Sequence, residues 1–146
     1  ASQEIYSSYD AVDLFFSWFN RGTNLVKLQD YAGAAAAYDQ AFAVYNTLPE
    51  DKSVRPYRIL WYQTGPYFAY YYMGGYYTVI DLANKAMEAI YFDDTAPEET
   101  LYWRGMAKIA LGDTSGGVED LRQSIDPFHP GFTPSIQQLQ AMGITP

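Results

Sequence analysis

The sequence predicts an all-α fold built from helix-turn-helix pairs, and three observations indicate it. Apolar residues recur three and four positions apart in several segments, which is the spacing of one helix face. Small residues take matching places in these segments, with Gly22, Gly65 and Gly105 about 40 residues apart. Turn-forming and acidic residues separate the segments. We therefore expect one domain over residues 1–146, with three pairs at about 11–46, 56–91 and 97–127 and a capping helix at 134–143.

The first pair is expected to consist of one helix from about Ala11 to Leu28 and a second that begins at Tyr31. Asp10 and Asp30 stand directly before these helices, and Asp is a favoured N-cap because its carboxylate accepts a free backbone N–H. Gly22 is small where two antiparallel helices approach closely, which a larger side chain would prevent.

The middle pair departs from this pattern in its first helix. Gly65 precedes Tyr76 by eleven residues, whereas Gly22 precedes Tyr31 by nine. Pro66 lies inside the helical pattern, where it lacks an N–H and crowds the preceding turn. We expect a long helix from about Pro56 to Met73 with a kink near Gly65 and Pro66, or a break into two helices.

The third pair and the terminal helix follow the pattern more closely. Pro97 and the two acids after it favour a helix start. Gly112 and Asp113 predict the turn, and Gly117 and Ser124 stand where the first pair has Ala. After a turn over 130–134, a short amphipathic helix should point Ile136 and Leu139 inward, as expected for a helix that caps an array.

The residue order within these pairs resembles the tetratricopeptide repeat family. The first pair carries its aromatic, Gly, Tyr, Ala, aromatic and Ala positions as Trp18, Gly22, Tyr31, Ala34, Tyr38 and Ala41. The resemblance implies a right-handed superhelical α-solenoid, in which the first helix of each pair lines a concave groove.

A narrower resemblance rests on the runs WYQTGPYFAYYYMGGYYTVIDLANKAM, YWRGMAKIALGD and HPGFTP. These look like a repeat module of bacterial proteins of the Chloroflexi type, where the module often follows a papain-like peptidase domain. The resemblance implies an accessory interaction domain of a secreted or lipid-anchored protein, while the residues themselves leave the compartment open.

Composition restricts the partners. The formal net charge is −8, and the acids are spread along the chain rather than balanced by clustered Lys and Arg. We therefore expect no nucleic acid and no anionic membrane surface as partner. Apolar stretches are too short for membrane insertion, and no signal peptide is visible. Because the first residue is Ala, we expect an excised or processed fragment.

Residues for catalysis are not apparent, so we expect no enzyme, no metal and no cofactor. The chain has no Cys, and its only His, His129, stands in a turn near a single acid, Asp126. The acidic pairs Asp93-Asp94, Glu98-Glu99 and Glu119-Asp120 are interpreted as capping and solubilising residues, because adjacent residues do not face each other across a cleft.

The tyrosine cluster is the candidate site. Eight Tyr lie between Tyr57 and Tyr77, so that the first helix of the middle pair is aromatic on all sides. Candidate groove residues, taken from the first helix of each pair, are Phe19, Thr23, Lys27, Tyr62, Tyr67, Tyr70, Tyr71, Tyr102, Met106 and Ile109. The alternative is that most of these tyrosines pack between pairs or form a dimer contact.

The leading functional hypothesis is a non-enzymatic module that binds a protein or peptide segment in an aromatic groove, because aromatic anchors supply contact area at low entropic cost. One alternative is an accessory domain that binds glycans or other small ligands by ring stacking. Another is a structural spacer that self-associates as a homodimer.

Overall fold

The computed structural model describes residues 8–47, 56–88, 98–125 and 131–146, and these ranges are helical without any strand. In chain order the helices are α1 (Ser8–Lys27), α2 (Tyr31–Asn46), the 3₁₀ helix η1 (Pro56–Trp61), α3 (Gly65–Tyr72), α4 (Tyr76–Glu88), α5 (Glu98–Ala110), α6 (Thr114–Gln123) and α7 (Thr133–Ala141). The predicted all-α class is therefore confirmed.

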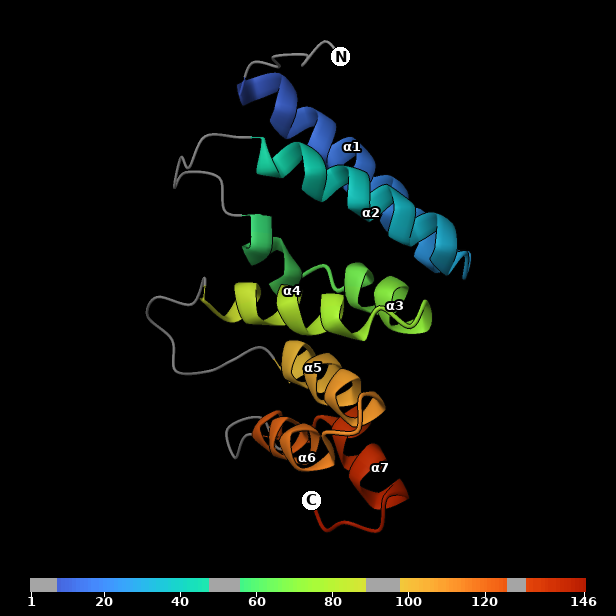
Figure 1. Cartoon of the computed structure of the whole chain (residues 1–146), viewed down its shortest axis with the longest axis vertical. Helices are drawn as coiled ribbons and strands as arrows, with labels where there is room; N and C mark the ends of the chain where they lie inside the picture. Colours follow the sequence, from blue (N-terminus) through green and yellow to red (C-terminus); the bar gives the residue numbers. More distant parts are fainter. Residues whose placement is uncertain (1–7, 48–55, 89–97, 126–130) are drawn as a thin grey trace.

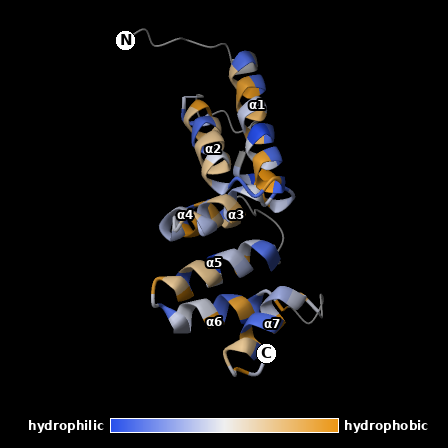
Figure 2. Ribbon diagram, turned by 90° about the vertical axis from the view of Figure 1, so that its right-hand side faces the viewer, coloured by the Kyte–Doolittle hydropathy of each residue, from blue (hydrophilic) through white to orange (hydrophobic). Residues whose placement is uncertain are grey.

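The helices stack in chain order along the longest axis of the molecule (Figure 1). Each α-helix packs on the next one along the chain, and α3 and α5 also contact the pair before them. Figure 2 shows hydrophilic and hydrophobic residues on the same helices, as expected where one face of each helix is buried.

The first pair agrees with the sequence except at its first cap. The carboxylate of Asp30 accepts the N–H of Gly33 at 3.0 Å, so its predicted N-cap role is confirmed. Asp10 is not an N-cap, because α1 begins at Ser8 and places Asp10 in the first turn, where a negative charge still favours the helix dipole. Gly22 lies against the ring of Tyr38, and a methyl group there would come within 2.7 Å of it.

The first helix of the middle pair is broken, so the expected long helix from Pro56 to Met73 is wrong and the alternative of two helices is confirmed. Pro66 lies in the first turn of α3, where its missing N–H leaves no helical hydrogen bond unmade. The shorter η1 is held by the indole of Trp61, which donates to the carbonyl of Ala86 on α4 at 3.0 Å.

Tyr38 joins the first two pairs. Its side chain is fully buried, and its hydroxyl hydrogen-bonds with the hydroxyl of Thr23 at 3.0 Å. A methyl group added to Gly65 would overlap this hydroxyl, so the glycine leaves room for it. Burial raises the pKa of Tyr38 to about 12, since the phenolate would lose its hydration there.

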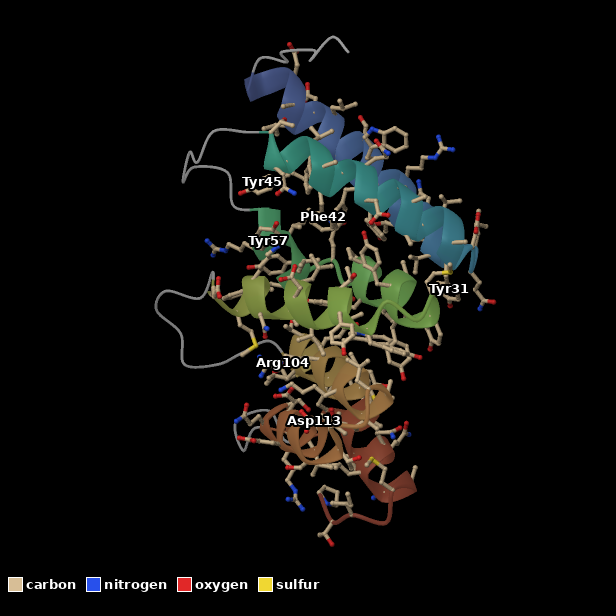
Figure 3. The ribbon with its side chains drawn as sticks, viewed as in Figure 1. Tyr31, Phe42, Tyr45, Tyr57, Arg104 and Asp113 are labelled. Atoms are coloured by element: carbon tan, nitrogen blue, oxygen red, sulfur yellow. The ribbon has the colours of Figure 1, made fainter. Side chains whose placement is uncertain are left out.

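Aromatic and polar contacts complete the stacking of the pairs. Figure 3 shows Phe42, Tyr45 and Tyr57 gathered where α2 meets η1, and the rings of Phe42 and Tyr57 stack with centroids 6.0 Å apart. Between the second and third pairs, the hydroxyl of Thr64 donates to the carboxylate of Glu99 at 2.8 Å.

The third pair confirms the predicted close approach and turn. A methyl group at Gly105 would lie 2.9 Å from the carbonyl oxygen of Gly117, and the carboxylate of Asp113 accepts the N–H of Gly116 at 3.0 Å as the N-cap of α6. Leu139 of α7 is fully buried as predicted, while Ile136 is half-buried.

Candidate functional site

A continuous series of ring contacts crosses the stack, and we call its members the aromatic band: Tyr31, Tyr71, Tyr72, Tyr102, Trp103 and Phe132. Tyr31 begins α2, two members end α3, two lie on α5, and Phe132 directly precedes α7. The ring centroids of successive members are 4.7 Å (Tyr31–Tyr72), 5.5 Å (Tyr72–Tyr71), 5.2 Å (Tyr71–Trp103), 5.1 Å (Trp103–Tyr102) and 6.0 Å (Tyr102–Phe132) apart. The band therefore joins all three pairs to α7.

The middle of the band is buried and one member is open to solvent. Trp103 is 4% exposed, and its ring also contacts Phe68 on α3 at 4.6 Å. Tyr72 is 55% exposed, and the next residue, Met73, is 53% exposed. The band is thus a packed row of rings in which Trp103 is buried at the centre and more than half of Tyr72 is open to solvent.

The rings of the band are apolar, and their polar groups are the tyrosine hydroxyls and the indole N–H of Trp103. Burial raises the pKa of Tyr71 and of Tyr102, and in both cases neighbouring groups that would repel a phenolate add to the effect. Both hydroxyls therefore stay neutral at physiological pH and can donate or accept a hydrogen bond. The indole of Trp103 donates to the carboxylate of Glu99 at 3.5 Å, which brings one acid close to the buried centre.

Two of the residues chosen from the sequence, Tyr71 and Tyr102, belong to the aromatic band. The structure brings them together through Trp103, which contacts both rings.

Three other chosen residues, Phe19, Tyr67 and Tyr70, do not line a surface, which corrects their assignment to a groove. Phe19 and Tyr67 are fully buried and Tyr70 is 7% exposed. Phe19 packs on Tyr38 within the first pair, with ring centroids 5.0 Å apart. These residues face the neighbouring helix because the helices rotate to bury their largest apolar side chains.

The buried tyrosines have polar partners within the protein. Tyr70 donates its hydroxyl to the carboxylate of Asp39 on α2 at 2.6 Å. The hydroxyls of Tyr67 and Thr100 lie 3.4 Å apart. Burial is the main cause that raises the pKa of both tyrosines. For these two residues, packing between pairs, the alternative considered for the tyrosine cluster, is the arrangement observed.

The remaining candidates do not belong to the aromatic band. Thr23 is half-buried against Tyr38, and Lys27 is exposed at the end of α1. Tyr62 is 75% exposed after η1, outside the band. Met106 and Ile109 are half-buried on α5, and Ile109 contacts Gly117 of α6.

Sequence reasoning missed four members of the band as site residues: Tyr31, Tyr72, Trp103 and Phe132. Tyr31 has a place in the repeat pattern as the start of the second helix, whereas Trp103 has no place of its own in that pattern. Tyr72 follows Tyr71 directly at the end of α3, and the two rings contact each other with centroids 5.5 Å apart. The contact of Phe132 with Tyr102 depends on where the start of α7 lies relative to α5.

A second cluster missed from the sequence is a buried ion group on α5 and α6. Asp120 is 3% exposed and accepts two hydrogen bonds from Arg104, at 2.8 and 2.7 Å, and its carboxylate lies 2.9 Å from the ammonium of Lys108. Arg104 also donates to the side chain of Asn84 on α4 at 3.0 Å (Figure 3 labels Arg104). The group therefore holds α4, α5 and α6 together. The solubilising role expected for Asp120 is wrong, because its carboxylate is buried and paired.

The described ranges offer neither a metal-binding cluster nor a membrane-spanning helix. They contain no group of three or more His, Asp or Glu placed to hold a metal ion. Within the same ranges, no helix has the length and apolar character needed to cross a membrane. His129, Asp126 and the Asp93-Asp94 pair lie outside the described residues.

A hollow of about 810 Å³ lies at the C-terminal end of the stack, away from the aromatic band. Its lining comes from α6 and the chain end: Thr114, Ser115, Val118, Glu119, Arg122, Gln123 and Ile144. None of these residues was among the candidates chosen from the sequence.

Comparisons of the chain with protein-family models, curated proteins and solved structures find no match.

Proposed function

We propose that this chain is a non-enzymatic protein-interaction module, a right-handed superhelical solenoid of three tetratricopeptide-like pairs that binds a peptide segment of a partner on the aromatic band. The observation that carries the proposal is the unbroken series of ring contacts from Tyr31 to Phe132, which leaves Tyr72 more than half exposed.

The composition of the band supports a protein partner. Aromatic side chains have few rotatable bonds, so their ordering on binding costs less entropy than that of long flexible chains. They also dominate the energetically important positions of protein interfaces. Tyr72 and Met73 together form an exposed apolar surface next to the buried Trp103, and such a surface suits an apolar side chain of a peptide.

The course of the band suggests how the peptide lies. The band crosses helices instead of following one, so a segment bound along it contacts α2, α3, α5 and the start of α7 in turn. That contact depends on the stacking of the pairs, whereas a single isolated helix pair would not present it.

Selection of peptides from a displayed random library against the immobilised chain tests the proposal. We expect enriched peptides that share aromatic or aliphatic anchors, and at least a tenfold loss of affinity for the Tyr72→Ala variant. Tyr77→Ala is the matched control, because Tyr77 is 77% exposed on α4 and belongs to no ring pair within the described ranges.

Two results would contradict the proposal. One is enrichment of no common peptide, or affinity that the Tyr72 and Tyr77 variants lose equally. The other is selective binding in a parallel oligosaccharide panel, lost in Tyr72→Ala, which would assign the band to glycans instead.

A further inference from the structure

The turn that follows α7 is the same turn that joins the two helices of every pair. Each of these four turns has one residue with a positive φ: Gln29 (60°), Gly74 (76°), Gly112 (92°) and Gly143 (71°). In each, the next residue donates its N–H to the carbonyl five positions back: Asp30 to Leu25 (2.9 Å), Gly75 to Tyr70 (2.8 Å), Asp113 to Lys108 (2.9 Å) and Ile144 to Leu139 (2.9 Å). This is the Schellman arrangement.

The second helices end differently where their ends are described. Thr47, the residue after α2, has φ −84°, and Ser124, the residue after α6, has φ −68°, both right-handed. The left-handed turn therefore distinguishes first helices from second helices in this chain. By that criterion α7 is the first helix of a fourth pair, and not simply a cap.

The hollow beside α6 lies where the chain leaves this fourth turn. Ile144 lines the hollow, and the guanidinium of Arg122 donates to the carbonyl of Thr145 at 3.3 Å. Pro146 follows Thr145 as Pro134 follows Thr133 at the start of α7.

The face of α6 that lines the hollow is covered in the earlier pairs. Counted from the turn, Thr114 and Arg122 correspond to Tyr31 and Asp39 of α2, which contact Tyr72 and Tyr70 of the following pair. Arg122 likewise corresponds to Asn84 of α4, which accepts a hydrogen bond from Arg104 of the next pair. On α6 the same positions border the hollow. The hollow thus continues an interface that the molecule uses twice already.

We propose that the hollow is the seat of an amphipathic helix, which runs antiparallel to α7 and completes a fourth pair. Its apolar stripe meets Val118 and Ile144, and its flanks bring charges complementary to Glu119 and Arg122. The exposed Gln137 and Gln140 on α7 require hydrogen-bonding side chains on its other side. The proposal does not involve the aromatic band.

The test joins residues 33–46 of α2 to Pro146, so that Thr145 and Pro146 take the places of Tyr31 and Ala32. Thermal unfolding followed by circular dichroism compares this extended chain with the 146-residue chain. We expect the extension to raise Tm by about 3 °C or more, since it adds a packed helix to a domain of this size. Methyl NMR signals of Val118 and Ile144 should shift in the extended chain.

Three controls keep the result specific. The same appended residues in shuffled order should give no rise in Tm. Val118→Glu should abolish the rise, whereas Thr78→Glu, at an exposed position of α4, should leave it intact.

An extension that leaves Tm unchanged, or a rise that persists with the shuffled residues or with Val118→Glu, would overturn the proposal. Light scattering of the 146-residue chain supplies a further arm. A dimer that Val118→Glu converts to a monomer would show that a second copy occupies the hollow, and would also overturn it.

Discussion

Arg104 on α5 donates two parallel hydrogen bonds, 2.8 and 2.7 Å long, to the carboxylate of Asp120 on α6, where the two helices of the third pair approach closely. The side chain of Asp120 is 4% exposed, while those of Arg104 and Lys108 are 16% and 25% exposed. A two-point contact of this kind fixes the rotation of one helix against the other, because the planar guanidinium matches the carboxylate in only one orientation.

Replacing Asp120 by Asn should destabilise the protein by about 2–3 kcal/mol, because two partly buried cations lose their counter-charge. Glu119→Gln is the matched control, since Glu119 is exposed on the same helix and should change stability by less than about 0.5 kcal/mol. Urea unfolding of the three proteins measures the difference. Equal stability of all three would show that the ion group does not hold α5 to α6.

Replacing Gly105 by Ala should destabilise the protein, although Ala favours a helix by up to about 1 kcal/mol over Gly. The added methyl group would lie 2.9 Å from the carbonyl oxygen of Gly117, and relieving such overpacking costs about 1–3 kcal/mol. Thermal unfolding decides the sign. A higher Tm than that of the parent chain would mean that α5 and α6 separate without penalty.

Stability should fall in alkaline solution through the buried tyrosines Tyr38, Tyr67 and Tyr70. Burial raises the pKa of Tyr38 to about 12, against 10.0 in the unfolded chain, and it raises the pKa of the other two as well. Because the folded pKa is the higher one, the unfolded chain releases protons first. The stability that these protonated tyrosines contribute is fully present below pH 10 and is lost as the pH rises through 12. For Tyr38 the loss in the free energy of unfolding is at most about 3 kcal/mol.

Urea unfolding between pH 8 and pH 11.5, with tyrosinate absorbance recorded in parallel, checks this expectation. Tyr38→Phe should flatten the decline, because it removes one of the tyrosine protons that the folded chain holds more tightly. A free energy of unfolding that stays constant above pH 10 would contradict the assigned burial.

Within the aromatic band, Trp103→Ala and Tyr72→Ala should differ strongly in stability. Trp103 is 4% exposed, and removing such a side chain from a core costs about 3–5 kcal/mol. Tyr72 is 55% exposed, so its removal should cost less than about 1 kcal/mol. Denaturant titrations of both variants provide the test, and a Tyr72 variant that unfolds readily would be unsuitable as a probe of binding.

Local features of the fold were accessible from the sequence because they depend on nearby residues. The N-cap Asp30, the turn at Gly112 and Asp113 and the close-packing Gly22 and Gly105 follow from spacing within one pair. For the break before α3 the sequence allows two outcomes, since Pro66 is compatible with either a kink inside a helix or the start of a new one.

Features that depend on the rotation of helices were not accessible. Phe19 and Tyr70 were placed in a groove by their position in the repeat, yet both turn toward a neighbouring helix. Arg104 and Lys108 share one helix face by their spacing of four, but the acid that they meet depends on how α6 packs. The same is true of the aromatic band, whose members come from four parts of the chain.

The chain-order stacking of the helices has a consequence for how the protein folds. Among the described side-chain hydrogen bonds, the largest sequence separation is the 35 residues between Thr64 and Glu99. Contacts of such short range need little loop closure before they form, so we expect folding within milliseconds or faster. Each helix also packs mainly on the helix before it and the helix after it. We therefore expect heating to unfold the stack progressively from an end inward, with α7 among the first helices to unfold.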